Sequence, residues 1–294
     1  MSTPPSLLVT GASGLVGQAL AARRTIVPLP RRAPADGGPW WEPAAATIHD
    51  PPPLIGGIVH LAGAPVADGR WTEKKKQAIY DSRVKGTAAL VSWLADRPQR
   101  PAVLVCASAV GFYGNRGDER LSEDAGPGEG FLAKVVADWE AEADKASALG
   151  IRVVKLRLGI VLSEDGGALA TMLPAFKLGL GGPLGSGRQW FPWLHIDDVI
   201  SVIEWALTDD SAQGAYNLAA PGICPQRDFA RALGSVLGRP AVLPAPRMAL
   251  KLAMGELADE ALLASQRVVP TRLEEAGYSW SFPELSGALK DVLG

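Results

Sequence analysis

The sequence predicts an α/β protein with a doubly wound parallel sheet and a smaller C-terminal substrate lobe. Short apolar runs alternate with long helical patterns over the first half of the chain, as a parallel sheet covered on both faces requires. A glycine-rich turn follows the first of these runs. Beyond Gly159 the regular alternation stops, and glycine and proline become dense in residues 178–192. The 294 residues suffice for one large domain that carries a smaller lobe.

The predicted strands are unbroken apolar runs, which are typical of strands buried on both faces. They cover residues 6–10, 25–29, 57–61, 102–107 and 152–156. Residues 72–96 and 130–149 have helical periodicity and predict two crossover helices, the second ending at Gly150. A helix is also expected over residues 197–208, and residues 225–294 predict short helices separated by prolines. We therefore expect a dinucleotide-binding domain in residues 1–160, to which later segments return, and a mostly helical lobe in residues 161–294.

Composition and charge exclude several classes of protein. Hydrophobic residues make up 47% and charged residues 20%, which is ordinary for a globular chain. The net charge of −2, without long runs of one sign, gives no attraction to nucleic acid or an anionic membrane. Residues 1–5 carry no targeting signal, and Cys106 and Cys224 form no redox or metal-spaced pair. We expect a cytoplasmic protein without a metal site, since His49 and His60 also lack ligand neighbours.

The glycine-rich turn predicts a phosphate-binding site. Gly11, Gly14 and Gly17 form a G-x-x-G-x-x-G pattern between the first strand and a helical stretch. Such glycines let the backbone turn sharply and approach a pyrophosphate, whose charge is then stabilised by the helix N-terminus. The order of strand, turn and helix makes the pattern much more specific than the glycines alone. It predicts a Rossmann-type dinucleotide site, with Ser13, Leu15 and Val16 contributing to the same turn.

The second strand is followed by Arg31 and Arg32, where an NAD enzyme usually has an acidic residue. Two guanidinium groups suit the 2′-phosphate of NADP. NADP is therefore expected, with NAD less favoured. A solvated basic loop is the alternative, because Asp36 lies about where the acidic residue of an NAD site would be and because the first crossover helix is unusually short.

Several segments together resemble one family. The likeness lies in residues 9–17, 60–65, 70–72, 82–87, 108–114, 156–162, 178–189 and 192–198. In addition, residues 270–277 resemble a short C-terminal domain of unknown function. They are similar to the extended short-chain dehydrogenase/reductase superfamily and, within it, to NAD-dependent epimerase/dehydratase proteins of the nucleoside-diphosphate-sugar epimerase type. The resemblance covers nearly the whole chain.

The resemblance implies further site residues. Leu61, Ala62 and Gly63 would pass along the adenosine side of the cofactor. Arg157 and Leu158, at the end of the 152–156 strand, would lie beside the nicotinamide. In the glycine-rich loop, Arg188 would hold a substrate phosphate or carboxylate, and Trp190 would offer a stacking surface, although surface exposure and core packing are the plainer interpretations.

The expected proton relay is incomplete. Relatives use a serine or threonine and a Tyr-x-x-x-Lys motif, whose lysine lowers the pKa of the tyrosine hydroxyl. Ser108 and Lys134 lie at suitable positions, but the residue four before Lys134 is Gly130, and the adjacent Phe131 is equally unable to exchange a proton. The standard relay therefore cannot operate at position 130.

Three explanations stay open. Tyr113 could replace the missing acid, or a carboxylate such as Asp118, Glu123 or Asp124 could do so. Alternatively, the protein lacks catalysis and senses NADP while it binds a partner. The favoured interpretation is an NADP-dependent oxidoreductase or epimerase for a small carbonyl or hydroxyl compound, with a nucleotide sugar as one candidate. The two long crossover helices could also pair in a homodimer. His195 and Asp198 are expected to be structural, with the aspartates capping the helix that follows.

Overall fold

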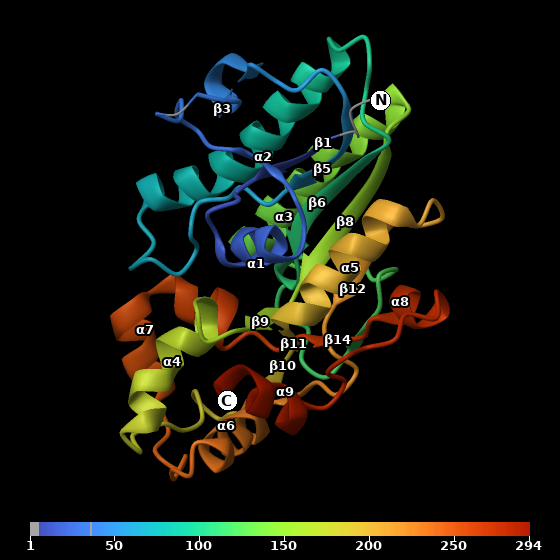
Figure 1. The fold of residues 1–294 in the computed structure, drawn as a ribbon. Coiled ribbons are helices and arrows are strands. Elements are labelled where there is room, and N and C mark those ends of the chain that lie inside the picture. Colours follow the sequence, from blue (N-terminus) through green and yellow to red (C-terminus); the bar gives the residue numbers. More distant parts are fainter. Residues whose placement is uncertain (1–5, 36) are drawn as a thin grey trace.

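The computed structural model describes residues 6–35 and 37–294 (Figure 1). Residues 1–5 and Asp36, which entered the predictions above, lie outside them. Six parallel strands form the central sheet in the order β12-β8-β6-β5-β1-β2. These strands are β1 (Ser6–Thr10), β2 (Val27–Leu29), β5 (Ile55–His60), β6 (Val103–Ala109), β8 (Arg152–Leu158) and β12 (Gly214–Leu218). The predicted fold class is confirmed.

Helices cover both faces of this sheet. Leu8, Ile58 and Leu104 belong to one core with α2 (Glu73–Ala95) and α3 (Phe131–Asp144). The next residue of each strand belongs to a second core, with α1 (Leu15–Arg23) and α5 (Ile196–Thr208). This division follows from strand geometry, because successive side chains point to opposite faces. The helices α1, α2 and α3 follow the parallel strands β1, β5 and β6 and so begin at the carboxyl edge of the sheet, where open α/β folds bind ligands.

The predicted helices match with small differences at their ends. Thr72 accepts a hydrogen bond from the Lys75 amide at 3.2 Å and so caps α2. Threonine is a favoured residue at this position before a helix. The predicted 130–149 helix ends as an α-helix at Asp144 and continues as a 3-10 turn, Lys145–Leu149. Gly150 closes this turn with a φ of 79°, a conformation that favours glycine.

Several short elements lie outside the strands and helices predicted from the sequence. A hairpin joins β3 (Trp40–Glu42) and β4 (Thr47–His49), and β9 (Ile160–Leu162) pairs with β11 (Trp193–His195). β12 adds a sixth strand beside β8, although the texture beyond Gly159 predicted no strands there. β3, β4, β9 and β11 are only three residues long, which is too short for an apolar periodicity to indicate a strand.

The C-terminal lobe packs around its own apolar core below the sheet (Figure 1). Leu169, Phe229 and Leu289 represent its three main helices, α4 (Gly167–Lys177), α6 (Gln226–Val236) and α9 (Leu285–Leu293). Its remaining elements are short: β10 (Trp190–Phe191), β13 (Cys224–Pro225), α7 (Arg247–Met254), a π-helical turn at Ala258–Leu262, β14 (Arg267–Val268) and α8 (Thr271–Glu275). β14 pairs with β7 (Arg120–Leu121), so the last part of the chain returns to the sheet domain.

No helix within residues 6–35 and 37–294 combines the length and the apolar character needed to cross a membrane.

Candidate functional site

A groove of about 790 Å³ opens at the carboxyl ends of β1, β2 and β5. The phosphate-binding turn, the end of β2, the turn after β5 and one side of α2 form its walls. The lining residues are Gly11, Ala12, Ser13, Gly14, Pro28, Leu29, Pro30, Arg31, Trp41, Pro43, Leu61, Ala62, Gly63, Pro65, Ala78, Asp81, Ser82 and Gly86. The groove thus brings together the predicted phosphate turn, Arg31 and the 61–63 turn.

The glycines of the turn are required by close backbone packing. Gly11 has a φ of 69°, and a Cβ there would lie 2.8 Å from the Leu61 carbonyl. A Cβ on Gly17 would lie 2.5 Å from the Gly11 oxygen. The amides of Leu15 and Val16 lie in the first turn of α1, where a helix has no internal acceptor for its N–H groups. The turn therefore fits a diphosphate, because bare backbone and a helix N-terminus line the groove there.

A buried hydrogen-bond network fixes the turn after β5. The Thr10 hydroxyl accepts hydrogen bonds from the Leu61 and Ala62 amides, both at 3.2 Å, and lies 2.7 Å from Nδ1 of His60. With its acceptor sites occupied, the hydroxyl donates to Nδ1. Nε2 of His60 consequently carries the proton and donates to Thr87 at 3.1 Å. Burial lowers the pKa of His60 to about 4, so the ring is neutral.

Arg31 and Arg32 are exposed, and Arg31 lines the groove. Among the described residues the structure pairs neither arginine with a carboxylate, so both can meet an anionic ligand. Trp41 also lines the groove, and its buried Nε1 has no hydrogen-bond partner within the described chain.

Arg83 supports the groove from below and was missed by the sequence analysis as a site residue. Its Nη1 donates to the Ala64 carbonyl at 3.0 Å, and its guanidinium lies 5.4 Å from the centre of the Trp139 ring. A Cβ on Gly63 would come within 3.0 Å of it. Burial lowers the pKa of Arg83 to about 10. The sequence feature that could have identified Arg83 is its place in the 82–87 segment, which carries the family likeness.

The structure does not assemble the predicted relay residues in the groove. Ser108 is buried and donates to Glu140 at 2.5 Å. Lys134 is exposed and forms an ion pair with Asp138 at 2.6 Å. Gly130 has a φ of 107° and directly precedes α3, so position 130 lies at the carboxyl edge of the sheet. No side chain from this position can reach a substrate.

Tyr113 and Arg157 belong to a buried polar network. Arg157 makes a bidentate ion pair with Glu140, with N–O distances of 2.8 and 2.9 Å, and donates to the Tyr113 hydroxyl at 2.8 Å. That hydroxyl donates to Asn217 at 2.7 Å. Burial raises the pKa of Tyr113, even though Arg157 opposes the shift. Neither side chain lines the groove, and Leu158 packs in the cores of the sheet.

The three carboxylates proposed as alternatives occupy different environments. Glu123 is buried, and its Oε1 accepts the Asn217 amide at 2.9 Å while burial raises the pKa of the carboxyl. Asp124 is exposed and pairs with Arg272 at 2.9 Å. Asp118 accepts the Trp190 indole N–H at 2.9 Å. None of the three lines the cofactor groove.

Arg188 is one of the residues that line a second, smaller cavity of about 310 Å³. Its lining residues are Gly117, Asp118, Gly185, Ser186, Arg188, Gln189, Arg247, Leu263 and Ser265. Trp190 borders this region through its bond to Asp118, and the Arg267 guanidinium lies 4.6 Å from the centre of its ring. Two arginines thus line one cavity, which suits an anionic group.

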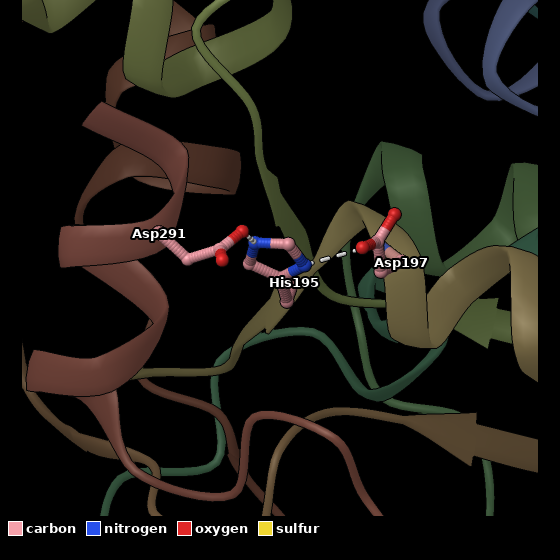
Figure 2. Close-up of side chains that lie close together, drawn as sticks. All are labelled: His195, Asp197 and Asp291. Carbon is pink, nitrogen blue, oxygen red and sulfur yellow. Dashed lines mark hydrogen bonds and ion pairs between the residues drawn. The ribbon is translucent and has the colours of Figure 1, made fainter. Parts of the chain in front are cut away.

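His195 lies between Asp291 on α9 and Asp197 at the start of α5 (Figure 2). Its Nδ1 accepts the Asp197 amide at 3.1 Å, and its Nε2 lies 3.2 Å from the Asp291 carboxylate on α9. Burial lowers the pKa of His195 although the nearby aspartates oppose this. The expected caps were wrong in detail: His195 caps α5, whereas Asp198 accepts the amides of Ser281 and Phe282 at 2.8 and 3.1 Å.

Comparison with known proteins supplies the family. Residues 54–219 match the model of the NAD dependent epimerase/dehydratase family, and residues 245–292 match a domain of unknown function (DUF1731). The chain is 39% identical to epimerase family protein Mb2239 of Mycobacterium bovis over 289 residues, which cover 96% of this chain and 95% of the relative. It is 41% identical to a chloroplastic epimerase family protein of Arabidopsis thaliana over 238 residues, covering 80% and 68%.

A solved relative shares the fold closely. The crystal structure of human epimerase family protein SDR39U1 with NADPH superposes with a TM-score of 0.89 at 34% sequence identity and covers 98% of both chains. Family model, full-length relatives and superposed structure agree with the resemblance inferred from the motifs. The chain belongs to the NAD-dependent epimerase/dehydratase family.

Proposed function

We propose that the protein is an NADP(H)-dependent oxidoreductase or epimerase that acts on a small carbonyl or hydroxyl compound. The observation that carries the proposal is the groove in which the Gly11–Gly17 turn, the 61–63 turn and Arg31 meet. The NADPH bound to the human relative supports this choice of cofactor. Residues 1–160, joined by α5 and β12, would hold the cofactor, and residues 161–294 would supply the substrate lobe.

The chain's own groups define how the site would work. The amides of Leu15 and Val16 and the positive end of α1 would hold the diphosphate. Arg31, with Arg32 nearby, would hold the 2′-phosphate, and the turn fixed by Thr10 would bound the adenosine side. The bound cofactor would supply or accept the hydride. Arg188 would orient a substrate through a phosphate or carboxylate in the second cavity.

The proposal is tested by titrating the purified chain with NADPH, NADH, NADP⁺ and NAD⁺ and following nicotinamide fluorescence or heat. We expect NADPH to bind on the order of tenfold or more tightly than NADH, because a charge-assisted bidentate contact is lost with the phosphate. Arg31→Ala should remove most of this preference. Arg231→Ala, which removes an equal charge from α6, should keep it. No affinity for any of the four forms would refute the proposal.

A second candidate is an NADP sensor without catalysis. It is favoured by one set of observations: Gly130 lacks a side chain, Lys134 pairs with Asp138, and the Tyr113 hydroxyl is enclosed. NADPH oxidation against a panel of small carbonyl compounds separates the candidates. Turnover supports the enzyme, and tight binding without turnover supports the sensor. Tyr113→Phe should retain turnover if the tyrosine only completes the buried network.

The two cysteines are unpaired, which suits the reducing cytoplasm proposed for the protein. A homodimer formed through α2 and α3 stays a prediction, and size-exclusion chromatography with light scattering would test it.

A further inference from the structure

A carboxylate from the C-terminal segment occupies the place of the missing tyrosine side chain. Oε1 and Oε2 of Glu260 accept the amides of Phe131 and Leu132 at 3.1 and 3.0 Å. A Cβ built on Gly130 would lie 2.5 Å from Oε1 and 2.7 Å from Oε2. A side chain at position 130 would therefore require this carboxylate to move. Glycine at 130 and glutamate at 260 form one complementary arrangement.

The segment that carries Glu260 lies where the binding regions meet. Glu256 forms an ion pair with Lys76 on α2, the helix whose next turns line the cofactor groove. Asp259 bonds to Arg247 at 2.9 Å, and both Arg247 and Leu263 line the second cavity. Between these contacts, Glu260 reaches the start of α3 at the carboxyl edge of the sheet. Glu260 thus lies on a segment that contacts both regions, although its own side chain is not among the residues that line either cavity.

We propose that Glu260 is the acid–base group of this site and replaces the tyrosine that Gly130 lacks. The inference rests on the proposed NADP-dependent function. In the oxidative direction, the substrate O–H bond breaks and its proton passes to a Glu260 oxygen. The C–H electron pair leaves as hydride to NADP⁺, and the carbinol becomes a carbonyl. The reverse direction returns the proton to the new hydroxyl and the hydride to its carbon.

The hydrogen bonds of Glu260 leave room for this role. A carboxylate has about four acceptor positions, and the Phe131 and Leu132 amides use two of them. These amides fix the group in position without filling it. The partial exposure of Glu260 also leaves it accessible, whereas Tyr113 is fully enclosed. The matched C-terminal domain, residues 245–292, contains Glu260 and thereby acquires a chemical role.

A binding ratio tests the position of Glu260 without knowledge of the substrate. The nicotinamide ring is positive in NADP⁺ and neutral in NADPH, so a nearby carboxylate favours the oxidised form. In Glu260→Gln we expect the ratio of NADP⁺ to NADPH affinity to fall on the order of tenfold, while NADPH affinity stays within about twofold. An unchanged ratio in a folded variant that binds NADPH overturns the inference alone. Failure of the unaltered chain to bind either form refutes the proposed function instead.

Two further variants serve as controls for the Glu260→Gln measurement. Glu256→Gln removes an equal charge from the same segment and loosens its contact with Lys76, and it should leave the ratio unchanged. A ratio that falls equally in Glu256→Gln would assign the effect to the segment and overturn the role of Glu260. Glu260→Asp keeps the charge but withdraws it by one methylene, so its ratio of NADP⁺ to NADPH affinity should remain near that of the unaltered chain. This variant provides the test should Glu260→Gln fail to fold. A tenfold fall of the ratio in Glu260→Asp overturns the inference.

Activity supplies a second readout once the carbonyl panel yields a substrate. Glu260→Gln should lower kcat by about a hundredfold or more at unchanged KM for NADPH, as expected for loss of a general acid–base group. It should also remove the limb of the kcat–pH profile that a carboxylate produces. A purely structural Glu260 would leave the shape of this profile unchanged, and that result overturns the inference.

Discussion

The imidazole of His60 shows how a single buried residue links the cofactor groove to pH. Its Nδ1 accepts from Thr10, its Nε2 donates to Thr87, and the same Thr10 hydroxyl positions the 61–62 amides at the groove. Burial brings the pKa of the ring down to about 4. The neutral form is therefore part of the folded structure.

We predict that stability falls as pH drops from about 6.5 to about 4. In this window the unfolded chain takes up a proton at His60 that the folded chain does not bind, so the free energy of unfolding decreases. The full shift corresponds to about 3 kcal/mol at 1.36 kcal/mol per pKa unit. Above pH 6.5 the contribution of the neutral His60 to the free energy of unfolding is fully retained.

Urea unfolding at pH 7.5 and pH 4.5 measures the effect. His60→Gln keeps a polar side chain between the two threonines and removes the titration, so its stability should depend less steeply on pH. Carboxylates are common to both proteins and cannot cause a difference between them. Identical pH dependence in the variant and the unaltered chain would therefore contradict the prediction.

At the scale of elements, the bidentate pair between Arg157 on β8 and Glu140 on α3 joins the sheet to a covering helix. Both side chains are buried, and the Arg157 guanidinium also lies 3.7 Å from the centre of the Phe112 ring. Removal of one partner leaves an uncompensated buried charge, which typically costs about 3–5 kcal/mol. A well-packed apolar pair costs much less.

We therefore predict that Glu140→Leu lowers the free energy of unfolding by about 3–5 kcal/mol, and that Arg157→Met restores much of this loss in the double variant. Chemical denaturation of the two single variants and the double variant measures the coupling. NADPH affinity of the folded double variant should stay close to that of the unaltered chain. A large loss of affinity would instead support the sequence-based expectation that Arg157 contacts the nicotinamide.

The predictable parts of the site are those built from neighbouring residues. The turn from Gly11 to Gly17 is local, so spacing alone identified it, and the long helices showed their full periodicity. The contacts of Glu260 could not be predicted, because 129 residues separate it from Phe131 and no pattern relates the two. Likewise, position made Ser108 resemble a relay residue and Arg157 a cofactor residue, whereas both side chains bond to Glu140 on α3.

At the scale of the whole molecule, the C-terminal region is held to the sheet domain by buried contacts. The Asp198 carboxylate on α5 is fully buried and accepts the Ser281 and Phe282 amides. β14 adds a backbone pairing with β7. These contacts predict that the two regions stabilise each other, rather than unfold one after the other.

Accordingly, urea unfolding followed by tryptophan fluorescence and by far-ultraviolet circular dichroism should give one coincident transition. Asp198→Ala should lower its free energy by about 2–3 kcal/mol, because two amides lose a charged acceptor. Ser281→Ala keeps the backbone amide and should change stability little. Two separate transitions in the unaltered chain would contradict the prediction.

The position of β12 has a consequence during synthesis. β12 pairs with the free side of β8, yet more than fifty residues of chain lie between these two strands. A ribosome needs a few seconds to make that length, and for this time the growing protein presents a row of unpaired backbone groups along β8. Until β12 emerges, this unpaired edge of β8 can pair with a strand of a neighbouring nascent chain.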